Sequence, residues 1–149
     1  MAGGNAGSGG GLGGSTGSAG TGGGGSGFIT GAVDGVVVRA ESAPKAGVQG
    51  VTDGQIWVVA GMAPAAWNLY VRNQVGMHDC SMGWVGLFDN NGNPRSDQGG
   101  GSCSVNVTSA APAIGDVIEG TFTATLKSTT PARTVTVTGG AFRVVRTDP

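Results

Sequence analysis

Charged side chains are scarce in this chain. Of its 149 residues, 8 are Lys or Arg and 9 are Asp or Glu, which gives a formal net charge of −1. Lys45 and Lys127 are its only lysines. Cations this few and this scattered predict no basic patch that could neutralise a phosphate backbone, so we expect no nucleic-acid binding.

Catalytic and membrane-spanning signals are also missing. His78 is the only histidine, so any Ser-His-Asp arrangement would depend on it, and the sequence contains no Gly-x-Ser-x-Gly elbow. We therefore expect a protein that is not an enzyme and needs no cofactor. No apolar run approaches the roughly 20 residues that span a bilayer, so we expect membrane contact only through a lipid anchor that this sequence does not carry.

Glycine, in contrast, is abundant and unevenly placed. The first 27 residues hold 15 of the 32 glycines, no charged side chain and, after the initiator, one large apolar residue, Leu12. Such a segment can bury almost no surface to offset the entropy lost on ordering. We expect residues 1–27 to be a flexible, disordered tail and residues 28–149 to form a single β domain, which is long enough for a substantial core.

Within residues 28–149 the dominant pattern is alternation between apolar and polar residues. In residues 117–127, Ile118, Phe122 and Leu126 share one face, and threonines occupy the other. Period two with a polar outer face is typical of a strand that packs on one side. The pattern predicts an all-β fold, either an antiparallel sandwich or a barrel-like meander of about nine short strands. These expected strands are residues 28–32, 36–40, 55–60, 67–72, 82–88, 102–108, 117–127, 134–138 and 141–146.

Gly and Asx residues mark the expected turns. Gly139 and Gly140 predict a tight hairpin between the last two strands. The run Asp89 to Asn93 also offers several oxygen ligands, but its glycine comes too early for an EF-hand loop and no Glu closes it. We favour an ordinary turn there over a calcium loop.

Cys80 and Cys103 are the only cysteines. An even number in a small β domain indicates a disulfide formed in an oxidising compartment, and closing the loop between them would stabilise the fold by about 3 kcal/mol. Two buried free thiols are the alternative.

Residues 77–82 contain soft ligands. Met77, His78 and Met82 could bind an ion such as Cu(I), although a disulfide would remove the thiolate of Cys80 from the ligand set. The alternative is a loop that leads into the following strand. Trp57, Trp67, Tyr70 and Trp84 could line a ligand cavity or a sugar-binding face, or could pack in the core and on the sheets. Tyr70 alternates with Trp67 and Leu69, so we expect it to lie on the more exposed face.

Five segments carry a family resemblance: Gly31-Ala32-Val33-Asp34-Gly35, the pair Ile56-Trp57, Trp67 to Val71, Gly115 to Phe122, and Val135 to Val144. In these segments the chain resembles small secreted lipoproteins of Bacteroidetes and myxobacteria, which place a Gly/Ser-rich tail before a β domain. The resemblance implies an all-β, calycin-like meander and a native form anchored by lipid at the cell surface. It brings no catalytic residue, because the shared positions belong to strands and turns.

Three functions remain open at this point. The first is a non-enzymatic domain, secreted or in the cell envelope, that is held by a flexible tether and binds an envelope protein or a glycan. The second is a carrier with a calycin-like cavity for a small ligand. The third is a self-associating extracellular subunit that assembles into filaments through its Gly-rich segment.

Overall fold

A computed structural model describes residues 27–48, 51, 54–62 and 64–148. The expected N-terminal tail therefore lies outside the described residues, apart from Gly27. The described part is all-β and holds a single three-residue 3-10 turn, η1 (Cys80–Met82), so it contains no helix with the length and hydrophobicity to cross a membrane. Its strands are β1 (Gly27–Val33), β2 (Val36–Ala40), β3 (Lys45–Gly47), β4 (Gln55–Met62), β5 (Ala65–Arg72), β6 (Gly76–Asp79), β7 (Trp84–Asp89), β8 (Ser102–Ser109), β9 (Val117–Thr129) and β10 (Ala132–Val145).

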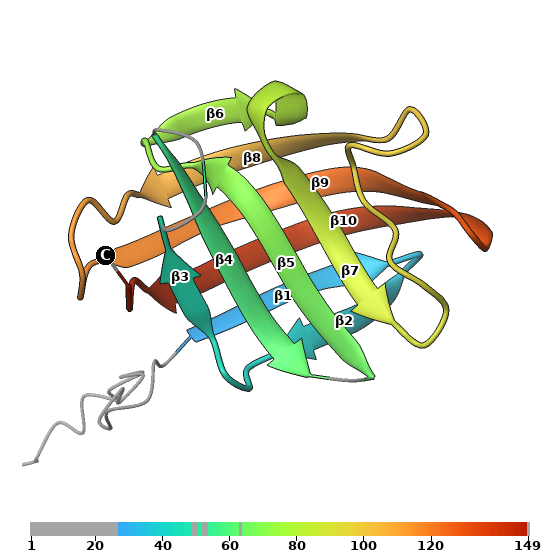
Figure 1. Ribbon diagram of the computed structural model, residues 1–149, viewed down its shortest axis with the longest axis horizontal. Coiled ribbons are helices and arrows are strands. Elements are labelled where there is room, and N and C mark those ends of the chain that lie inside the picture. The colour runs from blue at the N-terminus through green and yellow to red at the C-terminus, as the bar shows by residue number, and fades with distance from the viewer. Residues whose placement is uncertain (1–26, 49–50, 52–53, 63, 149) are drawn as a thin grey trace, which may run out of the picture.

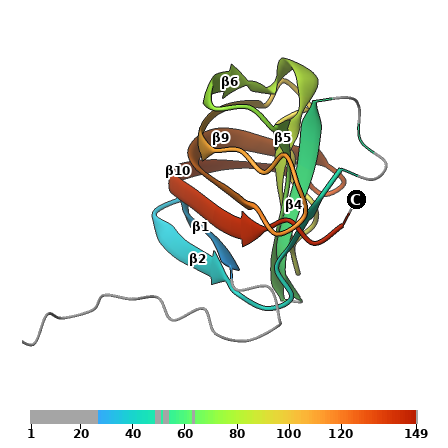
Figure 2. The ribbon, with the colours of Figure 1, turned by 90° about the vertical axis from the view of Figure 1, so that its left-hand side faces the viewer.

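These strands form two antiparallel sheets. One has six strands in the order β2-β1-β10-β9-β8-β6, and the other has four in the order β3-β4-β5-β7. Figure 1 shows the four-stranded sheet lying across the six-stranded one, and Figure 2 shows the two layers from the side. The structure thus confirms the all-β prediction and takes the form of a sandwich.

The core lies between the sheets and follows from the alternation in the sequence. The face of β9 that was expected to point inward is buried, as are Val135, Val137, Phe142 and Val144 on β10. On β5 the residues Trp67, Leu69 and Val71 are buried. The indole ring of Trp67 meets Phe122 of the opposite sheet edge-on, with ring centroids 5.6 Å apart.

Trp67 also has a polar contact inside the core. Its Nε1–H donates to the backbone oxygen of Val38 over 3.1 Å, so the one polar atom of the ring is satisfied although the side chain is fully buried. Gly31 gives the ring its space, because a Cβ there would lie 2.9 Å from Val137 and 3.4 Å from the indole.

Short bridges join the two sheets at both sides of the sandwich. On one side Arg95 pairs with Gly86 of β7 and with Lys127 of β9. On the other side Ala46 of β3 pairs with Arg146, just after β10. These bridges pair backbone groups that would otherwise stand open at the sheet edges.

The predicted hairpin at Gly139-Gly140 is wrong. Both glycines lie inside the single long strand β10, where the pairing with β9 shifts register between Val137 and Gly140. Gly139 has φ +57°, and a Cβ on Gly140 would lie 2.6 Å from the backbone oxygen of Phe122. The two glycines therefore accommodate a β-bulge, and the turn between β9 and β10 lies at residues 130–131.

Strand boundaries differ from expectation at the sheet edges as well. The described residues form ten strands rather than nine, since residues 134–138 and 141–146 merge into β10 while β3 and β6 are additional. These two strands have three and four residues, too few for alternation to be visible in the sequence. Met82, expected to open a strand, belongs to η1.

Replacing the central ring tests this account of the core. We expect Trp67→Ala to lower the free energy of unfolding by about 3–5 kcal/mol, because a large buried ring and its hydrogen bond are lost together. The control is Val75→Ala, at a side chain that is 61% exposed, which should change stability by less than about 0.5 kcal/mol. Urea unfolding of both variants measures the difference, and equal stabilities would contradict a core centred on Trp67.

Candidate functional site

Three of the aromatic residues singled out in the sequence form one row across the outer face of the four-stranded sheet. Trp57 on β4 pairs with Tyr70 on β5, and Tyr70 pairs with Trp84 on β7. All three side chains are half-buried. Since neighbouring strands lie about 4.8 Å apart, this aromatic row (Trp57, Tyr70 and Trp84) extends about 10 Å across the sheet.

The ring of Trp84 is held in place from both sides of β7. Tyr70 stacks on it from the β5 side, with ring centroids 4.7 Å apart and an interplanar angle of 25°. From the other side the guanidinium carbon of Arg95 lies 3.9 Å from the ring centroid, a cation–π contact. A Cβ on Gly86 would lie 2.8 Å from the indole, so the ring needs glycine at that position.

Arg95 is itself fixed at the end of the row. Its Nε donates to Asp97 over 2.8 Å and its Nη2 donates to the second carboxylate oxygen over 2.5 Å, a two-pronged ion pair. Its backbone N–H donates to the oxygen of Lys127 over 2.8 Å, and its backbone oxygen accepts the N–H of Lys127 over 2.9 Å. The row is therefore anchored to β9 of the opposite sheet through a single residue.

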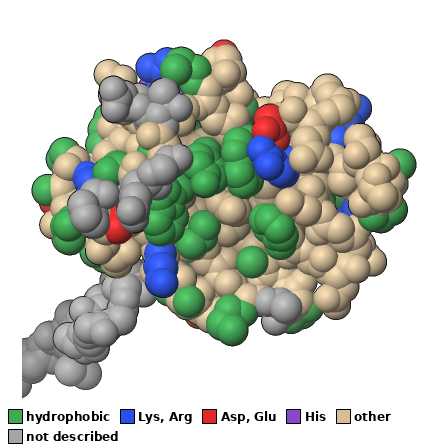
Figure 3. All heavy atoms as spheres, viewed as in Figure 1, with side chains coloured by type: hydrophobic (Ala, Val, Ile, Leu, Met, Phe, Trp, Pro, Cys, Tyr) green, Lys and Arg blue, Asp and Glu red, His purple; other side chains and the backbone are tan. Residues whose placement is uncertain are grey.

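Polar and small residues surround the aromatic row. Asn68, in the next register position of β5, faces Val59 and Gly86, and its buried Oδ1 has no hydrogen-bond partner among the described residues. Figure 3 shows the same face as Figure 1, with hydrophobic side chains gathered across its middle and a basic and an acidic side chain beside them. The face combines a rigid aromatic strip with groups that donate and accept hydrogen bonds.

Trp67, the fourth aromatic candidate, is not part of this row. It is fully buried and serves the core. Arg95 and Asn68, in contrast, are members of the site that the sequence analysis missed. Only strand register could have indicated them, because neither belongs to a recognisable motif.

The proposed soft-metal ligands come from two elements, since Met77 and His78 lie on β6 and Met82 lies on η1. Met77 pairs with Asn106 and His78 with Val105, so their side chains point to opposite faces. The ring of His78 contacts the Gln74 oxygen at 2.7 Å, and Met82 Sδ accepts a hydrogen bond from Arg72 over 2.7 Å. Within the described ranges, no three His, Cys, Asp or Glu side chains gather where they could share a metal ion.

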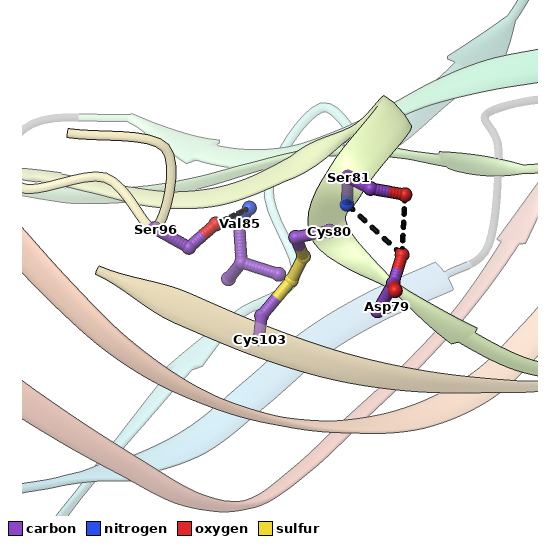
Figure 4. The surroundings of a disulfide bond; sticks show 6 residues. All are labelled: Asp79, Cys80, Ser81, Val85, Ser96 and Cys103. Carbon is purple, nitrogen blue, oxygen red and sulfur yellow. Dashed lines mark hydrogen bonds between the residues drawn. A yellow bond between two sulfur atoms is a disulfide. The ribbon is translucent and has the colours of Figure 1, made fainter. Parts of the chain in front are cut away.

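Cys80 and Cys103 form a disulfide in the structure, with Cα atoms 5.3 Å apart. Figure 4 shows that it ties the start of η1 to β8, close to Val85. On the other side of Val85, its backbone N–H donates a hydrogen bond to the buried hydroxyl of Ser96 over 2.9 Å. This pairing agrees with the predicted disulfide rather than with the alternative of two buried free thiols.

Residues 89–93 form the expected turn. Asp89 and Gly92 exchange backbone hydrogen bonds of 3.1 and 3.3 Å. The carboxylate of Asp89 accepts the N–H of Asn91 and pairs with Arg133 at 2.7 Å. Its oxygens therefore hold the turn and the tip of the β9–β10 hairpin rather than facing a common centre.

Two hollows lie on the opposite side of the sandwich, on the outer face of the six-stranded sheet. Their volumes are about 430 and 300 Å³. Ser and Thr dominate the lining of the smaller hollow, whereas the larger one mixes polar residues with Met77, glycines and other apolar residues; Ser104 and Thr123 border both. They contain no aromatic stack comparable with the aromatic row.

No family model, no curated protein and no solved structure matches the chain. The aromatic row supplies groups suited to binding, namely flat apolar surface, N–H and O–H groups and the guanidinium of Arg95.

The disulfide should stabilise the sandwich measurably. We expect the double variant Cys80→Ala, Cys103→Ala to unfold with a free energy about 3 kcal/mol lower than the wild type, because the unfolded chain regains the freedom of the closed loop. Reductant should lower the Tm of the wild type in the same direction and leave that of the variant unchanged. If reductant lowers both equally, the disulfide is not the cause.

The pKa of Asp79, which directly precedes Cys80, provides a second test in the region of the disulfide. Its carboxylate accepts the hydroxyl and the backbone N–H of Ser81, which together hold its pKa below the ordinary value of 3.8. We expect Ser81→Ala to raise this pKa toward 3.8, measured by NMR titration of the carboxyl carbon. The sign follows from linkage: a lowered pKa in the folded state adds stability that is present above pH 3.8 and is lost as the pH falls through the lowered value. An unchanged pKa would show that the hydroxyl makes no contribution.

Proposed function

We propose that this protein is a non-enzymatic, secreted or cell-envelope domain that is held by its Gly-rich N-terminal segment and binds glycans through the aromatic row. The observation that carries the proposal is the register that aligns Trp57, Tyr70 and Trp84 across three adjacent strands. A pyranose ring offers an apolar C–H face and a rim of hydroxyls, which match flat aromatic surface flanked by hydrogen-bonding side chains.

Rigidity of the site supports this proposal. Trp84 is fixed between Tyr70 and Arg95, so a ligand would not have to order this ring when it binds, and less conformational entropy would be lost. The row also lies on strands rather than on a loop, which favours a preformed binding surface.

The surroundings of the row favour a glycan over a protein partner. An obligate protein interface needs a broad apolar patch, whereas this strip is one residue deep and adjoins Asn68, Gly86 and the Arg95–Asp97 ion pair. Neutral sugar hydroxyls can exchange hydrogen bonds with such groups without leaving a charge unpaired.

The cell-envelope location rests on two features of the chain. A disulfide between Cys80 and Cys103 is typical of oxidising compartments. The 15 glycines of residues 1–27 give a composition suited to a tether, with an r.m.s. reach of roughly 30 Å if it behaves as a random coil. Together with the resemblance to secreted lipoproteins, these features favour a domain presented at the cell surface through a lipid anchor.

The test is glycan binding by matched variants. The wild-type chain is screened on an array of bacterial and plant polysaccharides, and hits are titrated by calorimetry. We expect Trp57→Ala and Tyr70→Ala each to weaken binding at least about tenfold, a loss of about 1.4 kcal/mol. Phe88→Ala is the control, since this exposed aromatic lies on the same sheet face but outside the row.

Two results would overturn the proposal. One is the absence of any array signal for the folded wild type. The other is an affinity that Trp57→Ala and Tyr70→Ala leave unchanged while both variants keep the wild-type Tm. Equal loss in Phe88→Ala would point to a nonspecific apolar effect and would also count against the row.

A further inference from the structure

The six-stranded sheet has one edge strand, β2, whose first three residues carry no charge, proline or covering segment in the described part of the chain. The other three sheet edges are covered or very short. Strand β6 has four residues and is tied down by the disulfide at Cys80. Strand β3 has three and pairs with Arg146, and β7 is covered by Pro94 to Ser96. Strand β2, at the margin of the sheet in Figure 2, begins with three successive valines.

The turn before β2 determines which backbone groups face the open edge. Asp34 and Gly35 have φ of +48° and +85°, as a two-residue hairpin turn with positive φ at both positions requires. In such a hairpin the flanking pair, Val33 and Val36, is hydrogen-bonded, and hydrogen-bonded pairs alternate with non-bonded ones along the strands. The N–H and C=O groups of Val37 and Arg39 therefore point away from β1.

These outward groups are free in the described part of the chain. Apart from the pairing of strands within the sheets, the described residues make no backbone hydrogen bond to Val37 or Arg39. The side chains of Val36 and Val37 are 67% and 72% exposed. Natural edge strands are usually protected by a lysine, a proline, a bulge or a covering loop, and within the described ranges residues 36–38 have none of these.

We propose that β2 pairs with β2 of a second copy of this chain, antiparallel and about a two-fold axis through Val38, so that the two six-stranded sheets become one continuous sheet. In this register Val37 of each copy lies opposite Arg39 of the other, and the two pairs exchange four backbone hydrogen bonds. A two-fold arrangement uses the same surface on both copies and closes the dimer.

Side-chain chemistry favours this register over one shifted toward Arg39. Val36 meets Ala40 of the second copy, and the two Val38 residues meet at the axis, so apolar side chains cover the exposed valine. A shift that moves the axis to Arg39 would place two arginines directly opposite each other, which is unfavourable. In the proposed register each Arg39 keeps its ion pair with Glu41, which directly follows β2 in the same copy, and faces a valine.

The inner face of β2 is already fixed for such pairing. The oxygen of Val38 accepts the indole N–H of Trp67, and Ala40 is buried. These contacts on the core side hold the strand extended and leave its outer edge open. The net charge of −1 per chain adds little repulsion between two copies.

The experiment is sedimentation equilibrium of the full chain over a concentration series. The wild type should show a monomer–dimer equilibrium. Val37→Pro removes one edge N–H per copy without disturbing the hairpin, and Val37→Lys adds a protecting charge; each should weaken dimerisation at least about tenfold. The matched control, Val75→Lys, alters a valine that is 61% exposed elsewhere and should dimerise like the wild type.

A second experiment tests the proposed register between the two β2 strands. In an isotope-filtered NOE experiment on a mixed labelled and unlabelled sample, the Hα of Val38 should contact the Hα of Val38 in the second copy, because non-hydrogen-bonded antiparallel pairs bring these atoms close. A wild type that remains monomeric up to about 1 mM, a weak limit on any specific association, would overturn the proposal. So would a dimer that persists in both folded Val37 variants, or one without the Val38 contact.

Discussion

Burial of Trp67 is the constraint on which the two layers depend. The ring fills the space between the sheets, touches Phe122 edge-on and donates its only polar hydrogen to the oxygen of Val38. That single side chain links β5 in one sheet to β9 and to β2 in the other. It also explains the glycine at position 31, where a side chain would crowd the core.

The placement of the aromatic row follows from this burial. Side chains alternate along a strand, so once Trp67 and Leu69 point into the core, Tyr70 must point outward. Antiparallel register then places Trp57 and Trp84 beside it. The outer face is therefore determined by the inner one, and a register slip that moved Tyr70 into the core would expose Trp67.

Much of the fold could be predicted from the sequence because the long strands alternate cleanly. The buried face of β9 follows from this pattern, and the expected strands 28–32 and 36–40 already leave the gap in which Asp34 and Gly35 make their turn. Gly139-Gly140 misled the prediction because the same dipeptide serves a tight turn or a bulge, and only its contact with Phe122 distinguishes them. For the site, Tyr70 could be placed outward from alternation, but Arg95 could not be joined to Trp84, since their contact depends on a bridge between β7 and β9 that no local pattern records.

The position of β1 has a mechanical consequence. Gly27 begins an interior strand that pairs with β10 on one side and β2 on the other. A force applied at Gly27 along the strand axis would therefore shear the hydrogen bonds to β10 and to β2 at the same time. The bonds would share the load instead of opening one by one from an end. A domain pulled through this residue should resist extension better than one pulled through an edge strand, which would suit an attachment that must hold under flow.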